Sequence, residues 1–410
     1  MPHDRLKAAL RKHVEDIEAT GNPKSRERVI REVSPPRDGK GPRLLLDGEG
    51  DRPFLRMNAN NYLGLSTNAQ MIAAEEEAVR AFGVGPGAVR FISGTMGPHT
   101  ELERRLAAFH NREAVMIFSS AYMAILGSLV PLVTKETAVI SDALNHNCII
   151  NAIRLANPSE KRIYAHNDLS ALEEHLQSVR GKCRRALIVT DGVFSMRGDF
   201  APLPEVMALA EKYDPEFEEN VIVFVDDSHG AGAFGRTGRG TEEVTGSSRS
   251  DVLVATLGKA FGVNGGYVAG PQALVDYLRE TAANYIYSNP ITPGEAAAAI
   301  KAVEIVDSPE GIEMLAHLSA MTARFEDGLA NMGLETIAGP HPVTPLMVRN
   351  TPRTKALVES LYSQGVLSTG LSYPVVPQGD ESIRFQISAE HTPTDIDEAL
   401  AAVKTAVAQN

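Results

Sequence analysis

Short apolar runs alternate with amphipathic segments through the middle of the chain. Strand-length apolar runs occupy residues 114–118, 138–140, 186–190, 221–225 and 252–255. Segments with helical spacing of apolar residues, such as 170–179 and 203–212, lie between them. This alternation predicts an α/β domain with a mostly parallel central sheet wrapped by helices.

The pattern changes at both ends of this region. After Pro293, long helices are predicted at 295–306 and 314–332, and short strands at 346–350, 365–369 and 383–388, which indicates a smaller α+β domain. Residues 4–20 predict an amphipathic helix that packs on a larger body, and residues 33–51, rich in proline, glycine and charge, predict a linker with one short strand. We therefore expect an N-terminal helix and linker arm at 1–53, a large domain at 54–293 and a small domain at 294–410.

Composition excludes several classes of function. The chain has 410 residues, 43% of them hydrophobic, and a formal net charge of -12, which argues against nonspecific nucleic-acid binding but leaves a local anion pocket possible. Two cysteines, Cys148 and Cys183, are too few for a disulfide framework or a Cys-rich zinc site, and we expect no metal. No apolar run approaches the ~18 residues of a membrane span, so we expect a cytoplasmic protein without a membrane partner.

Reactive side chains follow two of the predicted strands. The run 221–225 leads into Asp226 and His229, and the run 252–255 leads into Thr256 and Lys259. Ligands of open α/β sheets bind beyond the carboxyl ends of the strands. The sequence therefore predicts an active site that contains an acid, an imidazole, a hydroxyl and an amine.

A dinucleotide-binding loop is one interpretation of this region. Gly230, Gly232 and Gly235 match the spacing GxGxxG after a strand. In that fingerprint, however, the glycines follow the strand directly and open a helix, whereas here residues 226–229 intervene and a glycine-rich loop continues to Gly240. We reject the dinucleotide interpretation.

Lys259 suits a Schiff base with an aldehyde cofactor, because it lies at a strand end beside an acid and a histidine. Pyridoxal 5'-phosphate (PLP) needs such a lysine, a carboxylate at its pyridine nitrogen and donors for its phosphate. Asp226 could be the carboxylate, and His229 and Ser195 could reach the ring hydroxyl. Taken singly, each of these residues is more often a solvated or structural side chain.

Other candidates have two interpretations each. Residues 119–122 should begin a helix, whose first amides bind the phosphate or are only capped, and Thr256 could add a hydroxyl. His146, beyond another strand end, could stack on a flat ring or could be a capping or buried histidine. Arg384, on a predicted strand, could bind a substrate carboxylate or could form a surface or interdomain salt bridge.

Eight ordered blocks carry a family resemblance across nearly the whole chain. They are ANNYLGL (59–65), AVRFISGT (88–95), ISDALNH (140–146), TDGVFSM (190–196), VDDSHGAG (225–232), TLGKAFG (256–262), YSNPITP (287–293) and SYPVVPQG (372–379). In these blocks the chain resembles the α-oxoamine synthases, fold-type I PLP enzymes that condense an amino acid with an acyl-CoA. Within that family the blocks are most similar to those of the glycine C-acetyltransferases.

The resemblance implies a role for each matching residue. Lys259 would bind the cofactor aldehyde and later remove the Cα proton, Asp226 would bind the pyridine nitrogen, and His146 would stack on the ring. His229 and Ser195 would contact the ring oxygen, and the catalytic set would be Lys259, His146, Asp226 and His229. The remaining implied contacts are Ser120, Ala121, Tyr122 and Thr256 at the phosphate, Ser288 and Asn289 reaching it from the neighbouring subunit of a homodimer, and Asn60 and Arg384 at the substrate carboxylate.

Three positions depart from the family pattern and leave the acyl preference open. Arg197 stands where an acid is usual, Cys148 replaces a serine and Ala88 replaces a frequent serine. The resemblance implies glycine and acetyl-CoA as substrates, with 8-amino-7-oxononanoate synthase or a broad-specificity acyltransferase as alternatives. An aminotransferase would use the same lysine and aspartate without CoA, and a noncatalytic partner subunit is disfavoured because Lys259 is present.

Overall fold

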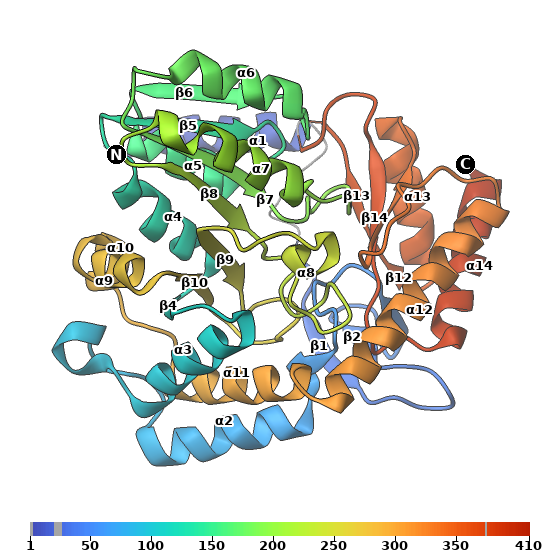
Figure 1. Ribbon diagram of the computed structural model, residues 1–410. Coiled ribbons are helices and arrows are strands. Elements are labelled where there is room, and N and C mark those ends of the chain that lie inside the picture. The colour runs from blue at the N-terminus through green and yellow to red at the C-terminus, as the bar shows by residue number, and fades with distance from the viewer. Residues whose placement is uncertain (1–2, 20–26, 374) are drawn as a thin grey trace.

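A seven-stranded sheet forms the centre of the protein (Figure 1). The computed structural model describes residues 3–19, 27–373 and 375–410. The strands of the sheet are β4 (Ala114–Phe118), β5 (Thr137–Asp142), β6 (Glu160–Tyr164), β7 (Arg185–Asp191), β8 (Val221–Asp226), β9 (Val252–Thr256) and β10 (Gly266–Gly270). Their order is β4-β10-β9-β8-β7-β5-β6, and only β10 runs antiparallel to its neighbours. The predicted mostly parallel sheet is confirmed.

The central strands are apolar throughout because both faces of the sheet are covered. Ile140 and Val223 belong to one buried cluster, whereas Val139 and Phe224 belong to a second cluster. Alternate residues of a strand point to opposite faces, so each strand contributes to both cores. Two strands were not predicted: β6, an edge strand whose residues alternate between partly buried and exposed up to the buried Tyr164, and β10, which begins and ends with glycine.

Helices cover each face of this sheet (Figure 1). One core contains side chains of α4 (Ala121–Leu132), α5 (Asn147–Ala156) and α9 (Gln272–Thr281). The other contains side chains of α3 (Gly97–His110), α6 (Leu169–Val179), α7 (Leu203–Tyr213) and α11 (Pro293–Val306). The predicted helices at 170–179, 203–212 and 295–306 therefore form close to the expected bounds. Further helices are α2 (Ala69–Phe82), α8 (Thr241–Thr245) and α10 (Ala283–Ile286).

The C-terminal part contains a three-stranded antiparallel sheet. Its order is β11 (Val343–Met347), β14 (Ser382–Gln386) and β13 (Thr369–Leu371), and it lies with α12 (Pro309–Asn331), α13 (Thr351–Ser363) and α14 (Pro393–Gln409) (Figure 1). The strand predicted at 346–350 begins earlier, and the strand predicted at 365–369 is divided between β12 (Val366–Leu367) and β13. Phe325 and Phe385 of this part belong to the same buried cluster as Ile140. This one of the two apolar cores therefore continues from the central sheet into the C-terminal part.

The N-terminal arm differs most from the prediction. The segment expected to be mostly linker contains β2 (Arg43–Leu46) and the end of β1 (Ile30–Ser34), which join β3 (Pro53–Arg56) and β12 in one sheet. The one short strand predicted in this linker forms as β2, but its tertiary partner was not predicted: Leu44 and Leu46 pack with Phe54 and also with Leu367, more than three hundred residues away. Such a long-range contact has no local sequence signal.

The predicted N-terminal helix forms as α1 (Asp4–Ala19), and residue 20 lies outside the described residues. Its predicted packing on a larger body is not seen among the described residues of one chain, where Leu6 and Leu10 are each 57% exposed. Among the helices that the structure describes, none combines the length and apolarity needed to cross a membrane.

The loop that follows β8 folds over the buried carboxylate of Asp227. This carboxylate accepts hydrogen bonds from the backbone N of Thr241 at 2.8 Å and from its Oγ1 at 2.6 Å, and burial raises its pKa to about 7. Gly240 has a φ of 89°, and a Cβ placed there would overlap Oδ2 of Asp227. Gly246 has a φ of 67°, and no atom lies within 4 Å of its Cβ position.

We expect Gly240→Ala to destabilise the protein more than the matched change Gly246→Ala. Gly246→Ala strains an αL backbone by about 1 kcal/mol, whereas Gly240→Ala costs roughly 1–3 kcal/mol in backbone strain, because a φ of 89° with a ψ of -155° is a conformation that essentially only glycine adopts. Only Gly240→Ala also displaces a buried carboxylate, which adds roughly 1–3 kcal/mol. Urea denaturation of the two variants measures the difference, and equal losses would contradict the packing described for Asp227.

Candidate active site

A cavity with about 670 Å³ of empty space, open to solvent, lies at the carboxyl ends of the parallel strands. Its lining comprises Ser120, Ala121, Tyr122, His146, Cys148, Asp191, Val193, Ser195, Asp226, Ser228, His229, Thr256 and Lys259. Nine of these are residues that the sequence analysis proposed for the cofactor. The structure thus brings together side chains that follow β4, β5, β7, β8 and β9, because parallel strands end at the same edge of the sheet.

One wall of the cavity is the first turn of α4. Ser120 is the N-cap residue, and its Oγ accepts a hydrogen bond from the backbone N of Met123 at 3.2 Å. The first amides of a helix have no partner within that helix and bind anions well. The capping interpretation of residues 119–122 is confirmed, and phosphate binding by the same turn, which faces the cavity, stays a prediction. Oγ1 of Thr256 donates to the carbonyl of Gly265 at 3.2 Å.

An amine lies near two carboxylates in the interior of the cavity. Asp191 and Asp226 are register partners at the ends of β7 and β8. Burial lowers the pKa of Lys259 to about 8, and the charges of Asp226 and Asp191 oppose this shift. Burial also raises the pKa of Asp191 well above its ordinary value, and the charge of Asp226 adds to that shift. The amine of Lys259 is therefore partly neutral near physiological pH, as a nucleophile or base must be.

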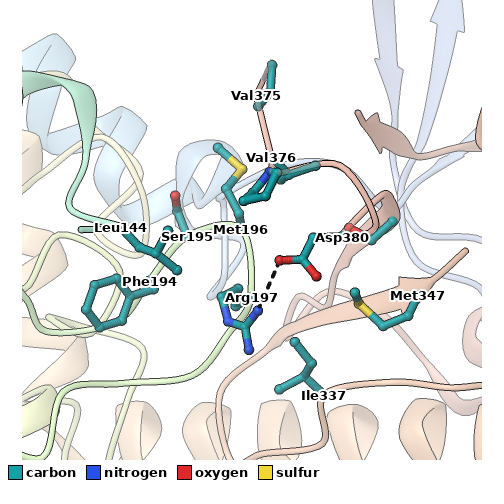
Figure 2. A pocket seen from close by; sticks show the side chains of 12 residues that line it. Leu144, Phe194, Ser195, Met196, Arg197, Ile337, Met347, Val375, Val376 and Asp380 are labelled. Carbon is teal, nitrogen blue, oxygen red and sulfur yellow. Dashed lines mark ion pairs between the residues drawn. The ribbon is translucent and has the colours of Figure 1, made fainter. Parts of the chain in front are cut away.

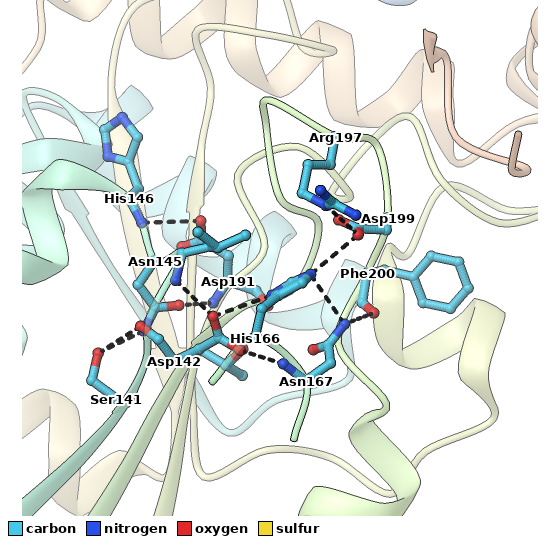
Figure 3. Close-up of polar contacts among 12 residues, drawn as sticks. Ser141, Asp142, Asn145, His146, His166, Asn167, Asp191, Arg197, Asp199 and Phe200 are labelled. Carbon is cyan, nitrogen blue, oxygen red and sulfur yellow. Dashed lines mark hydrogen bonds and ion pairs between the residues drawn. The ribbon is translucent and has the colours of Figure 1, made fainter. Parts of the chain in front are cut away.

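Asp191 was missed by the sequence analysis, although it follows a predicted strand just as Asp226 does. Its Oδ2 accepts a hydrogen bond from the backbone N of His146 at 3.1 Å (Figure 3). Its Oδ1 is buried and has no partner among the described residues. The position of an acid directly after the run 186–190 was the signal that could have identified it.

Two histidines border the cavity in neutral form. His229 Nδ1 lies 2.7 Å from the hydroxyl of Tyr62, and burial together with the charge of Lys259 lowers the pKa of this imidazole well below its ordinary value. Burial also lowers the pKa of His146, whose Nδ1 accepts a hydrogen bond from the backbone N of Cys148 at 3.3 Å. His146 therefore caps α5 and also lines the cavity. Tyr62 lies in the block ANNYLGL but had not been proposed as a site residue.

Arg384 lies beside the cavity rather than in its lining. Burial lowers the pKa of this guanidinium, whose Nη1 donates to the carbonyl of Ser195 at 3.0 Å. Its Nε is buried without a partner among the described residues, and no salt bridge to it is found there. Gln386, two residues along β14, donates to Oδ1 of Asn60. Arg384 and Asn60 are thereby held at the same side of the cavity. An anion there would accept a hydrogen bond from the unpaired Nε of Arg384.

Ser288 and Asn289 do not line the cavity. Both are exposed at the end of the segment that follows α10. Their predicted contact with the phosphate of a neighbouring subunit stays a prediction.

The residues around the cavity fit PLP. Lys259 can take an aldehyde, Asp226 can pair with a protonated ring nitrogen, and the first turn of α4 can bind a phosphate. Ser228 Oγ and Asp191 Oδ1 are buried without partners among the described residues, so polar groups remain for a ligand to satisfy.

Comparison with known proteins gives the family. Residues 52–403 match the model of the class I and II aminotransferase family. The chain is 41% identical over 357 residues to the 8-amino-7-oxononanoate synthase of Petrotoga mobilis, covering 85% of this chain and 87% of that protein. It is 39% identical over 400 residues to the mitochondrial 2-amino-3-ketobutyrate coenzyme A ligase of Bos taurus, covering 97% of this chain and 91% of that protein. It is an α-oxoamine synthase.

Solved structures agree with this assignment. The serine palmitoyltransferase (SPT) of Sphingomonas wittichii has a TM-score of 0.87 and 27% identity, covering 100% of this chain and 98% of that chain. A structure of SPT with its PLP internal aldimine has the same TM-score and identity. The predicted fold-type I architecture, the PLP dependence and the acyltransferase class of this α-oxoamine synthase are confirmed.

We expect Lys259 of the apoprotein to react with small aldehydes with a midpoint near pH 8 rather than near the ordinary 10.5. Reductive methylation across a pH series, followed by mass spectrometry of the peptide that contains Lys259, measures this midpoint. In Asp226→Asn the midpoint should fall further, because the negative charge of Asp226 raises the pKa of the amine and the substitution removes that charge. A wild-type midpoint near 10.5 would contradict the burial of this amine.

Proposed function

We propose that this α-oxoamine synthase condenses glycine with acetyl-CoA and releases CoA and 2-amino-3-oxobutyrate. The observation that carries the proposal is the buried, partly neutral amine of Lys259 in the cavity beside Arg384. The similarity to 2-amino-3-ketobutyrate coenzyme A ligase, which extends over 97% of the chain, supports the choice of substrates. The alternative, alanine with a pimeloyl thioester, is supported by several 8-amino-7-oxononanoate synthases of 40–41% identity.

Each polar residue of the site has a task in this reaction. PLP, when bound, supplies an aldehyde for the amino group and a ring that accepts the electron pair left at Cα. Asp226 pairs with the proton on the ring nitrogen, and Arg384 with Asn60 holds the substrate carboxylate. Lys259 takes the proton from Cα, because its lowered pKa leaves a fraction of the amine neutral. His146 and His229, both neutral, would hold the ring and its oxygen without adding charge.

A second cavity supports a neutral acyl group. It contains about 550 Å³ of empty space, shares Ser195 with the first cavity and is lined mainly by apolar side chains, among them Phe194, Met196, Met347 and Val376 (Figure 2). Arg197 is the cation in its wall, and it is already paired with Asp199 at 2.8 Å and Asp380 at 3.8 Å. A terminal carboxylate, as in pimeloyl thioesters, would meet Asp380 in the lining and an Arg197 whose charge is already paired, so the lining favours acetyl over pimeloyl.

Release of CoA thiol by the PLP-loaded enzyme tests the reaction. We expect glycine with acetyl-CoA to give the highest kcat/KM, and pimeloyl thioesters to give a value at least roughly tenfold lower, because their carboxylate is not neutralised. Lys259→Ala should lower the rate by more than about a thousandfold. Preference for alanine with pimeloyl thioester would favour the alternative, and absence of thiol release with every pair would contradict the proposal.

We also propose a homodimer in which each subunit completes the site of the other. Ser288 and Asn289 are exposed. The neighbouring Tyr287 is 79% exposed, and Phe91, in a turn that contacts α10, is 68% exposed. Large exposed apolar side chains of this kind are typical of an interface.

We expect two inactive variants to complement each other when mixed. Lys259→Ala and the double variant Ser288→Ala/Asn289→Ala, refolded together, form mixed dimers with one intact site. This arrangement should restore about a quarter of the wild-type activity. Activity should not return if each site is built within one subunit, and Lys259→Ala refolded alone is the control.

A further inference from the structure

His166 lies between two loops that carry active-site residues, although it does not line the cavity (Figure 3). One loop follows β5 and contains His146, and the other follows β7 and contains Ser195. The sequence analysis assigned no role to His166.

Both imidazole nitrogens of His166 face carboxylates. Nδ1 lies 3.3 Å from Oδ1 of Asp142, and Nε2 lies 3.1 Å from Oδ2 of Asp199. A carboxylate accepts hydrogen bonds, so both nitrogens donate and the ring carries a positive charge. Asn167 Nδ2 is a weaker neighbour at 3.4 Å from Nε2, and it also donates to the carbonyl of Phe200 at 3.2 Å.

Each aspartate is fixed within its own loop. Asp142 has a fully buried side chain and accepts hydrogen bonds from the backbone N of Leu144 at 2.8 Å and of Asn167 at 2.9 Å. Asp199 accepts from Nε of Arg197 at 2.8 Å, and its carbonyl accepts from the backbone N of Phe194 at 2.9 Å. The rings of His166 and Phe194 also pack edge to face, with centroids 4.3 Å apart. His166 therefore contacts the second loop through both a charge and a ring.

The second loop contacts the expected carboxylate-binding residue. The carbonyl of Ser195 accepts the hydrogen bond from Nη1 of Arg384, so a shift of this loop moves the partner of Arg384. The first loop is joined to β7 by a hydrogen bond from the backbone N of Asp191 to Oδ1 of Asn145 at 2.8 Å (Figure 3).

We infer that His166 is a positioning residue, whose bridge between Asp142 and Asp199 holds the Ser195 loop and thereby sets Arg384 to bind the carboxylate of the amino-acid substrate. The inference rests on the proposed role of Arg384, but it does not depend on which acyl donor is used.

The bridge should be sensitive to alkaline pH. Burial opposes the charge on His166, but the hydrogen bonds and charges of Asp142 and Asp199 outweigh it and raise the pKa to about 9. The charged groups facing this ring are Asp142 on β5 and Asp199 in the loop, with Arg197 sharing Asp199. Because the folded pKa exceeds the ordinary 6.5, the stabilisation is fully present below about 6.5 and is lost as the pH rises through about 9.

Binding of glycine to the PLP-loaded enzyme, followed by absorbance without an acyl donor, tests the inference. We expect His166→Gln to weaken glycine binding and to raise the KM for glycine about tenfold, with kcat changed by less than about threefold, since the reacting groups remain in place. His175→Gln is the matched control, because the one hydrogen bond of the His175 imidazole to the described residues joins it to the carbonyl of Ile163, away from the active-site loops. Glycine binding equal to that of the control would overturn the inference, as would a loss confined to kcat.

Asp199→Asn provides a second test of the same bridge, and it serves also if His166→Gln does not fold. If His166 acts through Asp199, the effects of the two changes on glycine binding should not add in the double variant. Additive effects would overturn the inference. Glycine binding is measured without acetyl-CoA. The binding result therefore still tests the role of His166 if the enzyme does not catalyse the proposed condensation.

The apoprotein supplies a readout that is independent of activity. The difference in urea midpoint between wild type and His166→Gln should be largest near pH 6.5 and should disappear above about pH 9. A difference that does not change with pH would overturn the charged bridge.

Discussion

The burial of one amine near two carboxylates is the constraint on which the rest of the structure depends. An ammonium group in an apolar interior is costly, and the carboxylates of Asp226 and Asp191 compensate for only part of that cost, so the pKa of Lys259 falls to about 8. The surrounding protein must therefore hold three ionisable groups in place, because removing one partner of a buried charged set leaves the others uncompensated. The parallel sheet does this by ending β7 and β8 in register, so that Asp191 and Asp226 lie side by side.

The remainder of the molecule brings polar groups from distant segments to this edge of the sheet. Two separate apolar cores fix the strands from both faces. The C-terminal sheet shares one of these cores and delivers Arg384 on β14. The loop that contains Ser195 connects the C-terminal sheet with the central sheet. The carbonyl of Ser195 accepts a hydrogen bond from Arg384, and Asp199 of the same loop faces His166. The same loop lies between the polar cavity around Lys259 and the apolar cavity beside Arg197.

Much of the site was predictable because its residues follow apolar runs directly. Asp226, Thr256 and Lys259 occupy the ends of β8 and β9 or the residues just beyond, and this position is visible in the sequence. Tyr62 and His166 were not proposed, because their roles depend on contacts with residues distant in the sequence. Tyr62, for example, reaches His229 over 167 residues. The capping and ligand interpretations of His146 could not be separated either, since the residue caps α5 and lines the cavity at once.

The sequence by itself determined a mostly parallel sheet, five of its strands with helices between them, and the chemistry of the residues that follow those strands. The period of apolar residues is a local property, and strand ends of a parallel sheet meet at one edge whatever the details of packing. Only the tertiary structure decided that the N-terminal arm joins a sheet with β12, that Asp191 faces Asp226, and that His166 lies between Asp142 and Asp199. Strand pairing, burial and the resulting pKa values depend on which distant segments come together, and apolar patterning does not encode that information.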